Sequence, residues 1–303
     1  MNEDHSSGYP FYSEITNVRP FLQLLRSFLV GKQHRFVTFC LDQEGPCRLL
    51  GESDDLSIQC SVEVPRQWFN VYSVTQRLTL TVAVNSLFNA LTLYSKCRRL
   101  DENAGYRGRE AHCHTTSCTA SLLYPSSNAL SVKVKVPYAV SVLEFLMYPR
   151  ELSSIPLDLG FDRHLVAATF KGSLAVLREC ILTLSSFGCD QLLIGWNEAK
   201  SVIVFEGIGS MYGAISCQIS ISHGTGNFFR KNEGYAFGSM KFAISSVVAV
   251  IGGLPGSPTP DSHDSPVEIQ WNEAGMRIHL QWEHDKYVGV NATGEFVLIP
   301  FVM

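Results

Sequence analysis

The chain repeats one order of predicted elements twice, and this duplication limits its possible folds more than any other feature of the sequence. In each half a strand leads into an amphipathic helix, three strands follow, and a further strand leads into a second helix and three closing strands. No period of about 20–50 residues is present, which excludes a solenoid. The sequence therefore predicts two copies of one domain.

Four segments place apolar residues three and four positions apart, as in a helix that is buried on one side. The predicted helical windows are 17–33, 84–99, 171–187 and 241–251. Asn17 can cap the first helix, and Gly31 can end it. The apolar positions are Phe21, Leu24, Leu25 and Phe28; Leu87, Ala90, Leu91 and Tyr94; Leu174, Leu177, Ile181 and Leu184; and Ile244, Val247, Val248 and Ile251.

Alternating or β-branched runs predict strands around these helices. The predicted strands are 35–40, 47–51, 56–64, 78–83, 115–123, 129–135 and 138–146, then 165–170, 191–196, 201–208, 213–220, 235–240, 267–271, 275–282 and 295–301. We predict an α+β chain whose domains are residues 1–146 and 164–303. Residues 147–163 contain Pro149, Pro156 and Gly160 and form a connector.

The composition of the chain excludes several classes of protein. The chain has 303 residues, of which 46% are hydrophobic and 17% charged, as in a globular protein. A net charge of −4 argues against a protein that coats nucleic acid with its whole surface. The sequence contains no long apolar run and no signal-peptide pattern, so we expect a soluble, intracellular protein. Its nine cysteines, several within apolar runs, fit a reducing compartment.

Positive charge is concentrated in the four helical windows. They contain nine basic residues and one acid, Glu179. The basic residues are Arg19, Arg26, Lys32, Lys96, Arg98, Arg99, Lys171, Arg178 and Lys241. If all four helices cover the same side of the sheets, their outer faces form a positive surface suited to a phosphate backbone, without base reading. The alternative is that these side chains only solvate exposed helix faces.

Several stretches carry a family resemblance. Asn17-Val18-Arg19 with Leu22, Leu24 and Leu25 is similar to the first helix of the Rad-one subunit family of the nine-one-one checkpoint clamp, and residues 34–39 to its next strand. Residues 205–210 and the closing segments 275–282 and 295–301 also resemble that family. Residues 100–112 and 254–266 are insertions relative to its pattern.

This resemblance implies a DNA-clamp fold of the proliferating cell nuclear antigen type, with antiparallel sheets outside and four helices lining one face. It implies a non-enzymatic nuclear subunit without a cofactor, which forms a heterotrimeric ring with two related clamp subunits. Such a ring would encircle double-stranded DNA, be opened by a clamp loader, and recruit checkpoint and repair proteins. The nine basic residues would then face DNA, and no membrane would be involved.

The resemblance also implies where the subunits meet. It places the strands that contain Tyr138, Val140 and Val142, and Gly213, Ile215 and Cys217, at the contacts. Residues 213–220 carry no charge, which fits either such an edge or a buried central strand. The connector residues Leu152, Ile155, Leu157 and Leu159 would border a pocket for client peptides, or would anchor the connector itself.

Other chemistry has weaker support in the sequence. His112, Cys113, His114 and Cys118 are four possible zinc ligands, but their crowding fits a polar loop better than a metal site. Two acidic pairs, Asp54-Asp55 and Asp101-Glu102, are the nearest candidates for the metal-binding carboxylates of a nuclease, and we interpret them as solvated turns. The alternatives are a homotrimeric replicative clamp, a Mg²⁺-dependent 3′–5′ exonuclease, and a duplicated scaffold without DNA contact.

Overall fold

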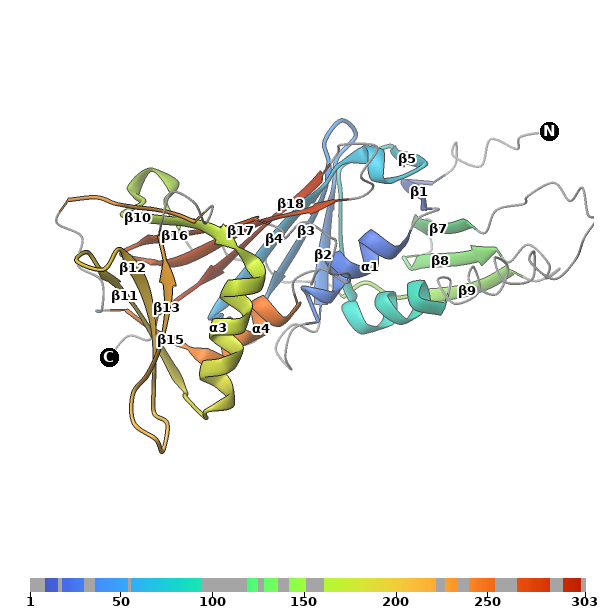
Figure 1. Ribbon diagram of the computed structural model, residues 1–303. Coiled ribbons are helices and arrows are strands. Elements are labelled where there is room, and N and C mark those ends of the chain that lie inside the picture. Colours follow the sequence, from blue (N-terminus) through green and yellow to red (C-terminus); the bar gives the residue numbers. More distant parts are fainter. Residues whose placement is uncertain are drawn as a thin grey trace, which may run out of the picture.

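Three antiparallel sheets and four α-helices make up the part of the chain that the computed structural model describes (Figure 1). The described residues are 9–15, 18–29, 36–53, 56–93, 119–124, 128–135, 142–150, 161–221, 227–233, 240–253, 266–283 and 291–300. None of the helices in these ranges is long and apolar enough to span a membrane.

The first half contains nine strands and two helices. In chain order these are β1 (Phe11–Ile15), α1 (Val18–Arg26), β2 (Phe36–Leu41), β3 (Cys47–Glu52), β4 (Ile58–Val64), β5 (Val71–Val74), β6 (Leu78–Ala83), a helix over residues 84–93, β7 (Thr119–Tyr124), β8 (Leu130–Lys135) and β9 (Val142–Met147). A short 3₁₀ turn, η1 (Arg66–Trp68), precedes β5.

The second half repeats this order. After the 3₁₀ turn η3 (Arg163–Leu165) come β10 (Ala168–Ser173), α3 (Leu174–Ser186), β11 (Gln191–Asn197), β12 (Val202–Ile208), β13 (Ile215–Ser220), β14 (Phe228–Lys231), β15 (Lys241–Ala243), α4 (Ile244–Gly253), β16 (Pro266–Asn272), β17 (Gly275–Glu283) and β18 (Asn291–Leu298).

The sheet topology repeats as well. The order β5-β1-β7-β8-β9 in the first half matches β14-β10-β16-β17-β18 in the second, and β4-β3-β2-β6 matches β13-β12-β11-β15. One pairing joins the halves, because β18 lies antiparallel to β4 from Thr293 opposite Glu63 to Leu298 opposite Ile58. Two of the four repeated sheets are thereby merged into one continuous nine-stranded sheet.

The apolar helix faces lie in the core as the sequence predicts. The predicted apolar positions of α1 and α3 are all buried, as are Leu87, Ala90 and Leu91 of the helix over residues 84–93. In α4 three of the four are buried, while Val248 is half-buried at the edge of the core. Tyr94 lies outside the described residues.

Two helices begin later than predicted. In the second half each strand runs directly into its helix: β10 ends at Ser173, whose hydroxyl accepts a hydrogen bond of 3.0 Å from the Val176 amide and so caps α3. Likewise β15 ends at Ala243, where α4 begins. The predicted windows that start at Lys171 and Lys241 are therefore wrong at their first residues, which belong to strands.

Three strands had no predicted residue range: β1, which the repeated order implies without giving its residues, and the two strands β5 and β14. The last two are four residues long and lie at sheet edges, where little alternation accumulates. The predicted strand 235–240 falls almost entirely outside the described residues, and the strand before α4 is β15.

The two halves bring helix and sheet together at matching glycines. A Cβ atom on Gly51 of β3 would lie 2.8 Å from the Phe28 ring, and one on Gly207 of β12 would lie 2.6 Å from the Cys189 sulfur. Phe28 follows α1, and Cys189 follows α3. Only glycine allows this approach without displacement of a buried neighbour.

Candidate nucleic-acid interface

The four helices lie on one face of the continuous sheet. Figure 1 shows α3 beside α4, and α1 beside the helix over residues 84–93. Of the two pairs, α1 contacts β17 and α4 contacts the neighbouring β18. On these strands Ile278 and Phe296 are buried toward the helices, whereas Glu295 reaches the opposite face. This arrangement satisfies the first condition for a shared helical surface.

Arg26 is exposed, as a residue that contacts nucleic acid must be. It is the last residue of α1, and its guanidinium lies 5.8 Å from the centre of the Phe88 ring on the neighbouring helix. Such a contact holds the stem of the side chain against the protein while the charge stays in water. The cation can therefore meet a phosphate group.

Arg178 has a different role from the one expected. Its Nε and Nη2 atoms donate hydrogen bonds of 3.3 and 3.1 Å to the carbonyl of Ile251, in the last turn of α4. Burial lowers the pKa of this guanidinium from its ordinary value. The charge satisfies a carbonyl at the negative end of a helix and fastens α3 to α4.

Lys171 and Lys241 are not on helices. Lys171 lies on β10, next to the buried Phe170, and its ammonium lies 2.9 Å from a Glu268 carboxylate oxygen on β16. Because neighbouring residues of a strand point to opposite faces, this ion pair lies on the face away from the helices. Lys241 lies on β15 and has contacts of its own. The prediction that Lys171 lies on the helical face is therefore wrong. The prediction that Lys241 lies on a helix is also wrong, because this residue belongs to the strand that precedes α4.

The described helical face is close to neutral in the second half. Outward positions of α3 carry Val176, Glu179 and Leu182, and α4 exposes Ser245. The remaining candidates belong to the first half, but Lys32, Lys96, Arg98 and Arg99 lie outside the described residues, as does the side chain of Arg19. Their orientation remains a prediction.

Within the described residues β9 and β13 are edge strands: β9 pairs only with β8, and β13 pairs only with β12. Of the predicted contact residues, Val142 begins β9, Gly213 precedes β13, and Ile215 and Cys217 are half-buried on β13. Tyr138 and Val140 lie outside the described ranges. The alternative reading of residues 213–220 as a central strand is wrong, since β13 is an edge.

Large apolar side chains accompany both edges. Tyr148, just after β9, is 74% exposed, and Met211 and Tyr212, just before β13, are 88% and 72% exposed. Tyr212 also packs edge-on against the Phe187 ring at a centroid distance of 6.2 Å. Exposed apolar groups of this size next to an open edge are typical of a protein–protein contact.

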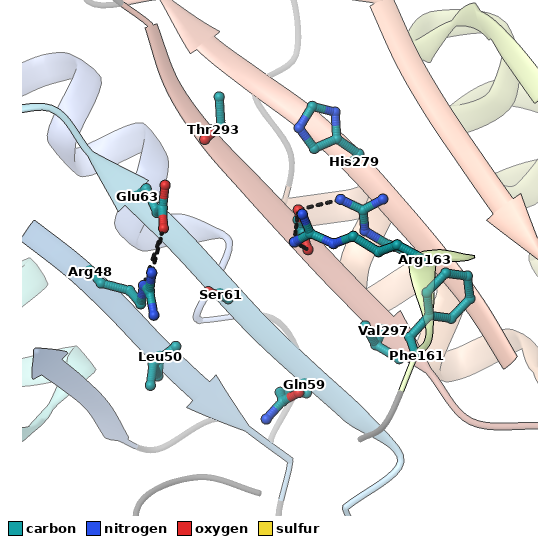
Figure 2. Close-up of a pocket in the computed structure, with 12 residues that line it drawn as sticks. Arg48, Leu50, Gln59, Ser61, Glu63, Phe161, Arg163, His279, Thr293 and Val297 are labelled. Carbon is teal, nitrogen blue, oxygen red and sulfur yellow. Dashed lines mark hydrogen bonds and ion pairs between the residues drawn. The ribbon is translucent and has the colours of Figure 1, made fainter. Parts of the chain in front are cut away.

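A polar groove of about 600 Å³ follows the outer face of the seam between β4 and β18 (Figure 2). Arg48 and Glu63 form an ion pair of 2.7 Å on one wall. Phe161 and Arg163, at the end of the predicted connector, lie on the opposite wall with His279. The groove thus lies between the two halves of the chain and beside the connector.

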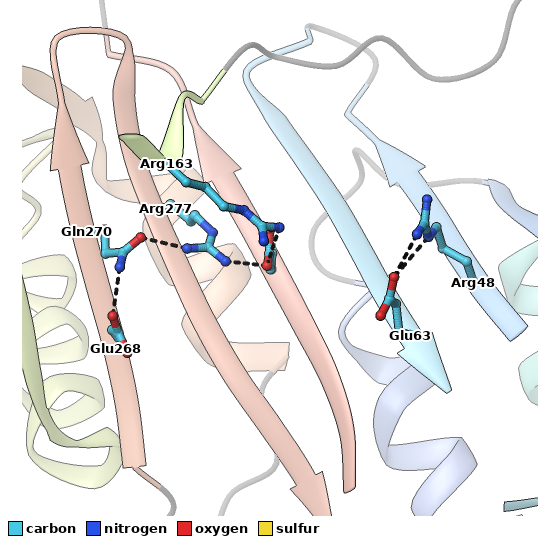
Figure 3. A network of polar contacts seen from close by, with 7 residues as sticks. Arg48, Glu63, Arg163, Glu268, Gln270 and Arg277 are labelled. Atoms are coloured by element: carbon cyan, nitrogen blue, oxygen red, sulfur yellow. Dashed lines mark hydrogen bonds and ion pairs between the residues drawn. The ribbon is translucent and has the colours of Figure 1, made fainter. Parts of the chain in front are cut away.

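A chain of polar contacts crosses three strands next to this groove (Figure 3). Gln270 donates to Glu268 at 2.7 Å and accepts from Arg277 at 2.6 Å, and Arg277 in turn donates to Glu295. Arg163 donates to the same carboxylate at 2.7 and 2.8 Å, which ties the end of the connector to β18. Arg277 is only 8% exposed, so its charge depends on these partners.

The electrostatics of this network follow from burial and neighbouring charge. Burial acts to raise the pKa of Glu295, but the hydrogen bond and charge of Arg277, together with the charge of Arg163, outweigh it and lower the pKa below its ordinary value. Burial, followed by the charge of Arg277, lowers the pKa of His279. At neutral pH the carboxylate is therefore ionised and the imidazole uncharged.

Comparison with solved structures decides the fold. Proliferating Cellular Nuclear Antigen from Entamoeba histolytica matches with a TM-score of 0.69, over 97% of this chain and 100% of that chain, at 12% sequence identity. The chain has the sliding-clamp fold. Neither the scan of protein-family models nor the search of curated proteins found a match.

Several residues proposed for a site from the sequence lie outside the described ranges. They are the connector residues Leu152, Ile155, Leu157 and Leu159, the possible zinc ligands His112, Cys113, His114 and Cys118, and the acidic pairs Asp54-Asp55 and Asp101-Glu102. Within the described residues no three side chains of His, Cys, Asp or Glu gather in a way that could hold a metal ion.

Sequence reasoning missed the outer face of this clamp-fold chain. Arg163, Arg277 and Glu295 are far apart in the sequence, and no local pattern connects them. Arg277 occupies a polar position of an alternating strand, where a solvent-facing side chain is expected, so no sequence pattern indicates its burial.

Proposed function

We propose that the chain is one subunit of a ring-shaped DNA sliding clamp. The observation that carries this proposal is that equivalent strands of the two halves are paired differently. By its place in the repeat, β9 corresponds to β18, and β13 corresponds to β4. The pair β18 and β4 meets inside the chain, whereas β9 and β13 are each paired on one side only among the residues that the structure describes.

The repeat itself indicates what completes these edges. If the β18–β4 pairing is copied between chains, β9 of one subunit pairs with the β13 equivalent of the next. Such head-to-tail contacts close into a ring when the rotation between subunits allows it. The uncharged β13 and the exposed Tyr148, Met211 and Tyr212 support an edge that is covered in the assembly.

In such a ring the helices face the hole and the duplex passes across them. Arg26 and the first-half residues Arg19, Lys32, Lys96, Arg98 and Arg99 supply the positive charge in this proposal. Contacts of lysine and arginine with phosphate are independent of sequence and individually weak, which suits a duplex that is retained by topology and slides. Because α3 and α4 contribute little charge, we propose that DNA is held mainly by the first half.

Among clamps, we propose a heterotrimer that acts in DNA-damage checkpoint signalling and repair in the nucleus. Support comes from the resemblance of residues 17–25, 34–39 and 205–210 to the Rad-one subunit family, and from the insertions at 100–112 and 254–266. Two related subunits, a clamp loader, and repair and checkpoint proteins would be the partners. Client segments would dock beside the connector, where the polar groove begins.

The size of the purified chain tests this proposal. Sedimentation velocity of the chain alone should give a monomer near its mass of 33.6 kDa. Addition of two related clamp subunits should give one complex that remains on circular DNA and leaves it when the DNA is cut. A trimer formed by the chain alone would instead identify a homotrimeric clamp. Failure to assemble under either condition would rule out the ring.

A further inference from the structure

A second cavity, of about 350 Å³, lies on the outer face of the second half beside β14. Its polar lining consists of Arg163, His164, Thr169, Arg230, Asn232 and Gln270. None of its nine lining residues is acidic. The cavity therefore presents hydrogen-bond donors and positive charge without a carboxylate of its own.

Two acidic groups near this cavity are already paired with cations. Glu268 is paired with Lys171, and Glu295 accepts hydrogen bonds from both Arg163 and Arg277. Arg230 is exposed on β14 and forms no ion pair with any residue that the structure describes. Arg230 thus remains a solvent-exposed cation at the edge of the cavity.

Hydrogen bonds within the protein hold the walls of the cavity in place. The Asp162 carboxylate accepts a hydrogen bond of 2.8 Å from the His164 amide and so caps η3. Asn232 donates from its side chain to the Val166 carbonyl at 2.8 Å and from its amide to the Ala167 carbonyl at 2.8 Å. A site that is ordered before binding loses less entropy when a ligand enters.

The repeat shows that the fold does not require this charge. In the first half the counterpart of β14 is β5, whose sequence Val-Tyr-Ser-Val has no charged residue. Arg230 and the neighbouring Lys231 are therefore features of the second copy alone. Near β5 the cation Arg66 lies over the Tyr72 ring of that strand, whereas Arg230 belongs to β14 itself, and this difference points to a partner of β14.

We propose that this cavity binds a phosphorylated side chain of a partner protein. A phosphoryl group carries close to two negative charges and three acceptor oxygens, which suits the Arg230 guanidinium together with Arg163, whose Nη2 is bonded to Glu295 and whose other nitrogens can donate to a ligand. The open edge of β14 lies beside it, so an extended peptide can add to the sheet while its phosphoryl group enters the cavity. This proposal does not depend on ring formation.

Nuclear magnetic resonance of the full ¹⁵N-labelled chain tests the proposal. The probes are three blocked tripeptides, Gly-phosphoSer-Gly, Gly-Glu-Gly and Gly-Ser-Gly. We expect the phosphoserine peptide to shift the amide signals of Thr169, Arg230 and Asn232 to saturation, the glutamate peptide to act more weakly, and the serine peptide to have no effect. Equal binding of the glutamate peptide would overturn the assignment to a phosphoryl group.

Arg230 and the neighbouring Lys231 provide a test variant and its matched control. Arg230→Gln should weaken binding of the phosphoserine peptide by about tenfold or more, since a charge-assisted hydrogen bond is lost. Lys231→Gln removes the same charge one residue away, on the opposite face of the strand, and should change affinity by less than about twofold. The proposal is wrong if both variants behave alike, or if a short DNA duplex shifts these signals and the peptide does not.

Discussion

At the scale of single residues, glycines decide how closely helix and sheet approach. Replacing Gly207 with Ala should lower the free energy of unfolding by about 1–3 kcal/mol, because the added methyl group overlaps the buried Cys189 side chain. Gly195→Ala is the matched control on the adjacent strand β11, where the nearest atom to a new Cβ is Val204 Cβ at 3.9 Å. It should change stability by less than about 0.5 kcal/mol. Urea denaturation of both variants measures the difference, and equal effects would contradict the argument.

The Glu295 carboxylate should give the chain an acid-sensitive contribution to stability. Its pKa is lower in the folded chain than the ordinary value of 4.5, so its stabilisation is present at neutral pH and is lost as pH falls through the folded value. Glu295→Gln should lower the free energy of unfolding by about 1–3 kcal/mol at pH 7, because it weakens the pairing of Arg277. The difference from the original chain should shrink as the pH falls below about 4.5 and through the lower pKa of the folded chain.

Glu63 offers the control for this pH dependence. Its ion pair with Arg48 is exposed on both sides, so Glu63→Gln should cost less than about 1 kcal/mol at any pH. Thermal unfolding at several pH values compares the two variants. A constant difference between Glu295→Gln and the original chain from neutral to acid pH would show that this carboxylate does not titrate as argued.

At the scale of elements, the open edge of β13 makes a prediction about assembly. In an antiparallel strand the amides of neighbouring residues point alternately to one side and the other, so one of Ser216 and Cys217 points its N–H away from β12. Of Ser216→Pro and Cys217→Pro, one should break a bond to β12 and lower the melting temperature. The other should leave the monomer stable and prevent assembly with partner subunits.

Circular dichroism and sedimentation velocity separate these two outcomes. Assembly that survives both proline substitutions would exclude β13 as a subunit contact. If a β13 variant loses assembly only because it unfolds, it does not test the subunit contact. The second test is then the same pair of substitutions on β9, Leu143→Pro and Glu144→Pro. If the ring is correct, one of these two variants must keep its stability and lose assembly.

Elements with a strong period were predictable, and those defined by pairing were not. The helix over residues 84–93 follows from Leu87, Ala90 and Leu91, whose spacing leaves little choice. By contrast β14 has four residues and is held by its pairing with β10, which no local pattern reveals. Lys171 was misplaced for a related reason: β10 continues into α3 without a turn, so polarity gives no boundary.

The candidate site was predictable in part for similar reasons. Arg26 could be placed because it lies opposite the buried face of an amphipathic helix. Arg178 could not, because its role depends on the Ile251 carbonyl, which only the packing of α3 on α4 brings near. Polar contacts between residues far apart in the sequence, such as Arg163 of η3 and Glu295 of β18, appear only in the tertiary structure.

At the scale of the whole molecule, the uneven charge of the helical face predicts an uneven contribution to DNA retention. Arg26→Glu combined with Lys96→Glu should weaken retention of the assembled ring on circular DNA by about tenfold or more, with a reduced dependence on salt. The control is Lys171→Glu combined with Lys133→Glu, which makes the same change in charge on sheet strands. Gel filtration of the ring on nicked circular DNA measures retention. Equal losses for the two variants would mean that the helices do not face DNA.

The pairing of β18 with β4 has a mechanical consequence for any such ring. These two strands belong to one polypeptide, so when they separate the tether returns them to each other at a high effective concentration. Strands of different subunits have no tether and drift apart on dilution. A ring made from this chain should therefore open at a joint between subunits, and each subunit should move as a stiff arc.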